Sequence, residues 1–246
     1  LGDVYKRQHE NDAYDVSGNA AITSLANFGG TGNAGNPSTT TFDLFSSDSS
    51  NRSYTFVKGA ETLSATSGEI ITGLQEFADT ETLDIDYLLM GPGDASSKTN
   101  TQSIATSVLS IAAGRKDCVG FISPYYGDVV GVTSSTTQTQ NVVDFYDSMQ
   151  ATSFGVFDSG WKYIYDRFAD KYRYVPLNGD VAGLCASVTA NGTPWFSPAG
   201  LNRGAIRGAV KLAFSPTKSE RDTLYQRRIN PVTSLPGQGI VLFGDK

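Results

Sequence analysis

The chain has 246 residues, of which 39% are hydrophobic and 18% are charged, and its formal net charge is −6. A chain of this length and composition can bury one large core or two unequal ones. The acidic balance disfavours attraction to nucleic acid or anionic lipid, and the sequence has no apolar run long enough for a bilayer span. We therefore expect no nucleic-acid partner and no direct insertion into a membrane.

The first part of the sequence is unlike the rest. The opening octapeptide "LGDVYKRQ" shares no pattern with the remainder of the chain, so we interpret residues 1–8 as a non-native leader. The single histidine, His9, comes directly after it. Residues 9–53 are polar and rich in Gly, Asn, Pro and Thr, which is typical of loops and turns. They cannot bury much alone and are expected to belong to a β-rich module.

From residue 54 onward, short apolar strands alternate with amphipathic helices. The patterns predict strands over 54–59, 83–90, 118–123 and 154–157, and helices over 67–79, 100–115 and 139–151. Ser67 is expected to cap the first helix and Gly114 to end the second. This alternation indicates a three-layer α/β domain over residues 54–246, with a mainly parallel central sheet.

The second half begins with an aromatic stretch, "WKYIYDRFADKYRYVPLNG". Its alternation predicts a hairpin, or a bent pair of strands, whose aromatic side chains point inward. Basic residues are interleaved with the aromatics, which leaves two alternatives: a stacking platform for single-stranded nucleic acid, or a contact surface for another protein. Further patterns predict helices over 179–192 and 215–229, capped in the second case by Ser215 or Thr217, and strands over 208–214 and 240–243.

A strand-to-helix turn containing Gly91 and Gly93 is the one candidate for ligand binding. Such turns hold phosphates at helix N-termini in many α/β proteins, although Ser96 stands where the dinucleotide fingerprint needs a third glycine. A nucleotide-binding α/β enzyme that uses this turn is therefore an alternative of a different class.

Other catalytic patterns are weak. A Ser-His-Asp triad would depend on His9, and the two cysteines, Cys118 and Cys185, match no metal or redox spacing. The carboxylate pairs Asp84/Asp86 and Asp144/Asp147 fit strand-end solvation or helix capping better than acid–base catalysis. We expect no catalytic residue, cofactor or metal, and no enzymatic activity.

Four ordered blocks in the last third of the chain carry a family resemblance. They are "GWKYIYDRFADKYRYVPLNGDVAGLCA", "PWFSPAGLNRGAI", "SERDTLYQRRINPV" and the terminal "GQGIVLFGDK". In sequence and order these blocks resemble the tail sheath proteins of contractile-tailed bacteriophages, particularly the T-even-like group. The upstream pieces "TFVKGA", "GLQEFADTETLDIDYLLMGPG" and "CVGFISP" are similar to the same family with less specificity.

The resemblance implies a subtilisin-like topology without protease activity. It also implies a structural, self-assembling virion subunit that stacks in hexameric rings around a tail tube and contracts to drive the tube through the host envelope. The implied partners are other sheath subunits, the tail tube protein, the baseplate and the tail terminator, with assembly in the host cytoplasm. The sheath of a non-phage contractile injection system is the alternative of the same class.

The resemblance further implies that the chain is an internal fragment lacking the C-terminal domain, with residues 9–53 as the remnant of an inserted outer module. Charged residues within the matched blocks are candidates for contacts between subunits: Arg203, Arg227, Arg228, Asp245 and Lys246. Separately, Pro231 is expected to end the preceding helix by keeping Asn230 out of the α region. Gly237 and Gly239 are expected to let the chain turn sharply into its last strand.

Overall fold

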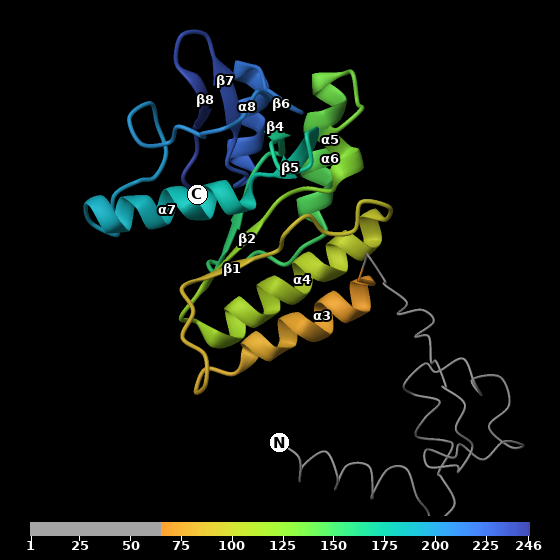
Figure 1. Cartoon of the computed structure of the whole chain (residues 1–246), viewed down its shortest axis with the longest axis vertical. Helices are drawn as coiled ribbons and strands as arrows, with labels where there is room; N and C mark the ends of the chain where they lie inside the picture. The colour runs from red at the N-terminus through yellow and green to blue at the C-terminus, as the bar shows by residue number, and fades with distance from the viewer. Residues whose placement is uncertain (1–64) are drawn as a thin grey trace, which may run out of the picture. The chain divides into compact units, whose positions relative to one another are not determined.

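The computed structural model describes residues 65–246 (Figure 1). The expectations for residues 1–8 and 9–53, for His9 and for a strand over 54–59 lie outside the described residues. Among residues 65–246, no helix combines the length and the apolar character that crossing a bilayer requires.

A three-stranded parallel sheet lies at the centre of the fold. Its strands are β1 (Tyr87–Leu89), β2 (Val119–Ile122) and β3 (Gly155–Phe157), in that order. The strands predicted over 83–90, 118–123 and 154–157 are thereby confirmed, with shorter bounds. Each is a short apolar run between helical segments, the pattern of a strand buried on both faces.

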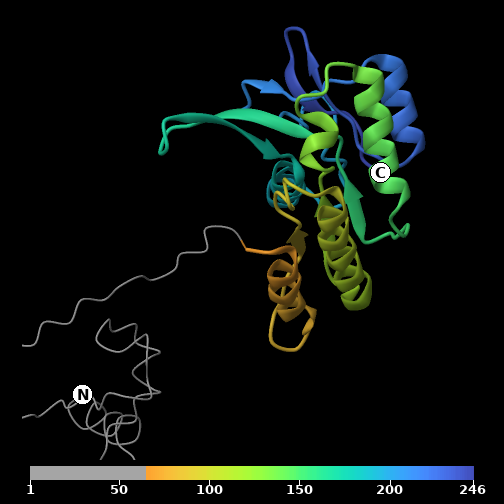
Figure 2. The same cartoon turned by 90° about the vertical axis from the view of Figure 1, so that its right-hand side faces the viewer.

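Helices cover both faces of this sheet, as the sequence predicts. The helices α4 (Lys98–Arg115) and α6 (Ser135–Asp147) share one core with Ile122, whereas α7 (Asn178–Asn191) shares a second core with Phe121. Successive residues of a strand point to opposite faces, so Phe121 and Ile122 direct the two cores to opposite sides. A further helix, α3 (Ser67–Gln75), followed by η2 (Glu76–Ala78), lies beside α4 (Figures 1 and 2).

Two glycines allow α4 to pack close to the sheet. A Cβ atom on Gly120 would lie 2.9 Å from the Val108 side chain, and one on Gly155 would collide with Leu109. Both contacts are closer than van der Waals separation, so a larger residue at either strand position would push α4 away from the sheet.

The parallel central sheet is as predicted, and the remaining strands form two further, antiparallel sheets. An antiparallel sheet has the order β5–β4–β6, formed by β4 (Trp161–Asp166), β5 (Lys171–Pro176) and β6 (Lys211–Leu212). A two-stranded antiparallel ribbon is formed by β7 (Val232–Leu235) and β8 (Gly239–Leu242). Short turns join β4 to β5 and β7 to β8, and such short connections can only pair strands antiparallel. The hairpin predicted for the aromatic stretch is confirmed.

Several helix boundaries differ from those predicted. Thr66, rather than Ser67, caps α3 through a capping box with Glu69. The helix α4 continues past Gly114 and ends where Lys116 adopts a left-handed φ of 65°. The helix α8 (Lys218–Gln226) takes Thr217 as its cap, one of the two residues predicted. A last short helix, α5 (Tyr126–Val129), comes after β2.

Candidate interaction surface

The carboxyl end of the parallel sheet, where α/β proteins bind their ligands, is filled by a buried polar network. The Ser123 hydroxyl donates to the Asp158 carboxyl at 2.5 Å, and the backbone N–H of Gly160 donates to the same carboxyl at 2.9 Å. The N–H of Asn178 donates to the Ser123 hydroxyl, and the Tyr146 hydroxyl donates to the Asp158 carbonyl. Side chains of the protein itself thus occupy the usual ligand position.

Burial dominates the electrostatics of this network. Asp158 is 1% exposed, and the loss of water raises the pKa of its carboxyl to about 8, although the bonds from Ser123 and Gly160 oppose the shift. No histidine occurs among residues 65–246, so Ser123 has no imidazole base there. The network joins the parallel sheet to the start of β4 and of α7, which is a structural role.

The turn at Gly91 and Gly93 is tight, as predicted, with φ values of 73° and 66°. The Asp94 carboxylate fills the space beyond it, accepting bonds from Ser96 N at 2.9 Å and from Asn100 Nδ2 at 2.7 Å. These bonds lower the pKa of Asp94 to about 2, the hydroxyl of Ser96 contributing most. An ionised carboxylate thus stands where a phosphate would bind, so nucleotide binding at this turn is not favoured.

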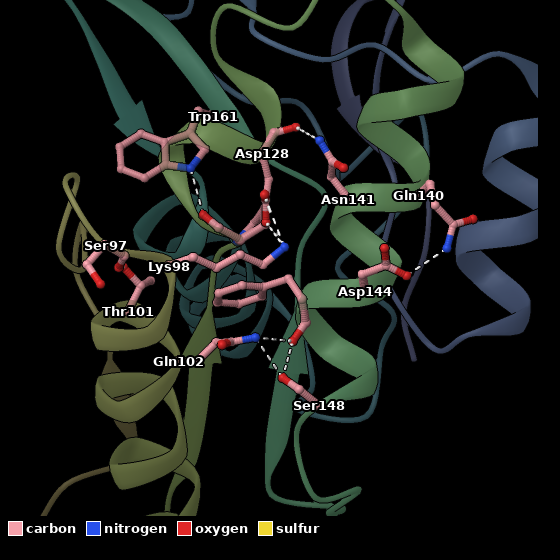
Figure 3. Close-up of polar contacts among 12 residues, drawn as sticks. Ser97, Lys98, Thr101, Gln102, Asp128, Gln140, Asn141, Asp144, Ser148 and Trp161 are labelled. Carbon is pink, nitrogen blue, oxygen red and sulfur yellow. Dashed lines mark hydrogen bonds and ion pairs between the residues drawn. The ribbon is translucent and has the colours of Figure 1, made fainter.

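Polar contacts also join α4 to α5 and α6 (Figure 3). Lys98 Nζ lies 3.1 Å from Asp128 Oδ1, and Asn141 Nδ2 donates to the Asp128 carbonyl. One turn further along α4, Gln102 Nε2 donates to Ser148 Oγ at 2.8 Å. These contacts tie together helices distant in sequence, so the unit is braced as one body on this face of the sheet.

All four carboxylates of the two predicted pairs are exposed. The predicted strand over 83–90 includes Asp84 and Asp86. In the structure both residues are exposed and come before β1, so that part of the prediction is wrong. On α6, Asp144 accepts from Gln140, and Asp147 pairs with Arg227. No cluster of three or more His, Cys, Asp or Glu residues lies within metal-binding reach in the described part of the chain.

The two cysteines are free thiols. Cys118 is buried and Cys185 half-buried, and burial raises the pKa of both.

Three of the predicted contact residues lie around the C-terminal end of α8. Arg227 Nη1 is 3.1 Å from Asp147 Oδ2, Lys246 Nζ lies 4.1 Å from the ring centroid of Tyr225, and Arg228 comes shortly after α8. Asp245 is exposed beside Lys246. Arg203 lies on a separate loop, with its guanidinium 5.2 Å from the Phe196 ring centroid. All five predicted residues are exposed, and their role in contacts between subunits stays a prediction.

The end of α8 differs from the expectation that Pro231 terminates it. The last helical residue is Gln226, and Arg228 then adopts a left-handed φ of 63°. The N–H of Ile229 donates to Leu224 O and the N–H of Arg228 to Tyr225 O, the two bonds of a Schellman motif. A local backbone motif therefore ends the helix before Pro231 takes effect.

The turn residues fulfil the geometry predicted for them. Gly237 and Gly239 have φ values of 74° and 82°, which only glycine adopts freely, and they join β7 to β8. Asn230 is buried, and its side chain bonds both the N–H and the carbonyl of Lys246 at 2.7 Å. Asn230 thus fixes the last described residues against β3.

Among residues 65–246, a group of exposed aromatic side chains lies on the β4–β5 hairpin, the stretch for which the sequence left a nucleic-acid platform and a protein contact surface as alternatives. Tyr163 pairs with Tyr174, and Tyr165 with Tyr172, so these four side chains share one face. Their ring centroids lie 4.6–5.4 Å apart in successive contacts. In the turn, Phe168 is 88% exposed.

The hairpin has an anchored inner half and a free outer half. Trp161 is buried and donates from Nε1 to the Pro124 carbonyl at 2.9 Å, and Tyr126 packs edge-on against it. Beyond that anchor the hairpin projects from the rest of the unit (teal in Figure 2), and Tyr165 and Tyr172 are 48% and 56% exposed. The expectation that the aromatics point inward is correct for the inner half and wrong for the outer half, because alternation does not reveal where a ribbon leaves the body.

The fold and these sites together define an α/β domain in which a polar network fills the carboxyl end of the parallel sheet. An aromatic hairpin projects from its surface. A model of the family described as "Phage tail sheath protein central domain" matches residues 64–246. The chain belongs to this family, as the four sequence blocks indicate.

Relatives agree with that assignment. The tail sheath protein of Enterobacteria phage T4 is 36% identical over 190 residues, which cover 74% of this chain and 29% of that protein. The tail sheath protein of Vibrio phage KVP40 is 36% identical over 208 residues, covering 78% of this chain and 31% of that protein. The tail sheath protein of Salmonella phage ViI is 34% identical over 141 residues, covering 57% of this chain and 22% of that protein. This chain thus spans about three tenths of the length of its first two relatives.

Among solved structures, the cryo-EM structure of the anti-feeding prophage baseplate has a TM-score of 0.49 and 14% sequence identity. The match covers 71% of this chain and 40% of that one. A similarity of this size does not bear on the fold or on the function.

Proposed function

We propose that this chain is the central part of a structural subunit of a contractile phage tail sheath. The observation that carries the proposal is the family match over residues 64–246, together with 36% identity to sheath proteins of two phages. In this role the subunits stack as hexameric rings around a tail tube. Contraction of the rings then drives the tube through the host envelope. The partners are other sheath subunits, the tube protein, the baseplate and the tail terminator.

The packing supports a domain that moves as a rigid body. A contracting sheath transmits force between rings, so its subunits must exchange one set of interfaces for another without deforming inside. The Asp158 network joins the sheet to β4 and α7, and the Lys98–Asp128 contact joins α4 to α5. Close-packed interiors with satisfied polar groups resist deformation.

The subunit is proposed to be non-enzymatic, with a subtilisin-like topology. The filled carboxyl end of the sheet supports the first point, as does the Asp94 carboxylate at the Gly91–Gly93 turn. Neither a nucleotide-binding enzyme nor a non-phage injection apparatus is favoured, since the named relatives are sheath proteins of phages.

Immunoelectron microscopy tests the proposal. Antibodies raised against this chain should label the tail of the phage that encodes it along its whole length, in extended and contracted particles. Antibody absorbed with the purified chain serves as the control and should give no label. Label confined to the capsid or to the baseplate would contradict a sheath role.

A further inference from the structure

The outer half of the hairpin combines exposed aromatics with unpaired positive charge. Arg173 pairs with Asp166 at 2.7 Å and Lys162 pairs with Asp180, so both are neutralised locally. Arg167 and Lys171 are exposed and make no ion pair with any residue of the 65–246 segment. Asp170, exposed in the same turn, accepts from the Tyr165 hydroxyl and makes no ion pair either. The unpaired groups of the hairpin tip therefore carry a net charge of +1, two cations against one carboxylate, on a chain whose net charge is −6.

A second surface has the opposite character. Residues 65–86, which include α3 and η2, contain six carboxylates and no Lys or Arg. All six are exposed: Glu69, Glu76, Asp79, Glu81, Asp84 and Asp86. Phe77 and Leu83 are each 37% exposed within this acidic segment. It lies well apart from the hairpin tip in both views (Figures 1 and 2).

The acidic segment is held in a fixed shape. The Arg115 guanidinium donates to the carbonyls of Phe77, Asp79 and Leu83 at 2.6–2.8 Å and pairs with Asp117. The exposed carboxylates and the two apolar side chains are thus presented by a braced loop. A pre-ordered surface of this kind loses little conformational entropy on binding.

Resting on the proposed function, we propose that the basic aromatic hairpin of one copy docks on the acidic segment 65–86 of a second copy. The charges are complementary, and Phe168 and Tyr172 supply apolar contacts for Phe77 and Leu83. The two patches are different surfaces of one chain, so the contact is heterologous and repeats from copy to copy. A projecting two-stranded ribbon is only marginally stable in water, and docking would support its outer half.

Single-stranded nucleic acid is the competing occupant of a basic aromatic ribbon. Two observations favour a second copy. Tyr163 stacks on Tyr172, and the rings of Tyr174 and Tyr165 lie tilted against this pair, so the tyrosine faces are partly occupied by one another. The guanidinium of Arg167 lies over the ring of Phe168. The hairpin carries only two unpaired cations, whereas the complementary surface with six carboxylates is on the same chain.

Charge reversal tests the proposal. Sedimentation velocity of the chain at about 50 mM NaCl, where charge screening is weak, should show self-association at high micromolar concentration. Either Arg167→Glu with Lys171→Glu, or Glu76→Lys with Glu81→Lys, should raise the dissociation constant at least about tenfold, since like charges would then face each other. A chain with all four substitutions should associate as the unaltered chain does. An equimolar mixture of the two double variants should also assemble, although neither does so alone.

The control matched to the hairpin variant is Arg207→Glu with Lys218→Glu, which changes the net charge by the same −4 at exposed positions outside both patches. It should leave association unchanged, and thermal denaturation should show every variant folded. A chain monomeric up to about 1 mM under the same weak screening would overturn the proposal, as would variants that associate normally. Binding of a labelled oligothymidylate that disappears with the hairpin variant would assign the surface to nucleic acid instead. None of these association results changes the antibody labelling of the tail, so the docking proposal can fail while the sheath role stands.

Discussion

The network around Asp158 and the outer half of the hairpin differ in burial: the first buries polar groups, and the second exposes aromatic side chains. At Asp158 every polar group has a partner and water is excluded. At the hairpin tip, Phe168 and Tyr172 are mostly exposed although aromatic side chains usually gain stability by burial. The polar groups around Asp158 find their partners within the fold, whereas the aromatic side chains at the hairpin tip keep much of their surface open to solvent.

The difference suggests two roles: the buried network stabilises the domain, and the exposed hairpin tip is a surface that another molecule can contact. In a subunit that exchanges interfaces, the interior must be indifferent to the neighbour, whereas the contact surface must not be needed for folding. Substitutions in the buried core should therefore lower folding stability, whereas substitutions at the hairpin tip should weaken association and leave folding stability nearly unchanged.

The sharpest way to break the comparison is a matched pair of aromatic substitutions. Phe145→Ala, at a side chain 0% exposed in the core, should lower the free energy of unfolding by about 3–5 kcal/mol. Phe168→Ala, at a side chain 88% exposed, should change it by less than about 0.5 kcal/mol. Urea denaturation of both variants measures this. Comparable losses would mean that the hairpin tip is packed as part of the core.

The pH dependence of stability tests the buried side of the comparison. The pKa of Asp158 is about 8 in the folded chain and near 3.8 in an unfolded one, so the folded state holds a proton that the unfolded state releases between those values. The contribution of Asp158 to stability is then fully present below about pH 4 and falls as pH rises to about 8, by about 4 kcal/mol between pH 5 and pH 8. Denaturation at several pH values measures the slope.

Asp158→Asn is the matched variant, because an amide resembles the neutral carboxyl in shape. It should remove most of the slope, and Asp128, whose pKa burial also raises, should account for the remainder. Stability that rises over this pH range, or a slope unchanged in the variant, would show that Asp158 is ionised in the fold.

Much of the fold is set by local patterns, and the rest depends on tertiary placement. The buried run around Phe121 and the helical spacing of Ile104 and Val108 predicted a strand and a helix correctly. Alternation around Tyr163 predicted a hairpin. Alternation alone could not reveal that the hairpin passes the edge of the domain beyond Tyr163.

The position of the charged patches could not be predicted for the same reason. Arg115 looks like an ordinary helix-end cation in the sequence, yet it orders the loop that carries the acidic segment. Likewise, lysine and arginine do not indicate the left-handed backbone conformation that Lys116 and Arg228 adopt. Such conformations are set by backbone bonding at a helix end, and the usual sign, a glycine, is absent there.

The smallest expected effect concerns Arg228 and sharpens the distinction between folding and contact. Arg228→Gly should raise the free energy of unfolding by about 0.5–1 kcal/mol, because glycine adopts the left-handed φ of 63° without steric strain. The control Gln226→Gly, at the last residue of α8, should instead lower it by about 0.5 kcal/mol, because glycine is a weaker helix former than glutamine. Paired denaturation curves measure both, and a destabilised Arg228→Gly variant would mean that the arginine side chain itself stabilises the fold. Because Arg228 is exposed and is a predicted contact residue, a variant that gains stability but assembles poorly would show that the strained arginine serves the interface rather than the domain.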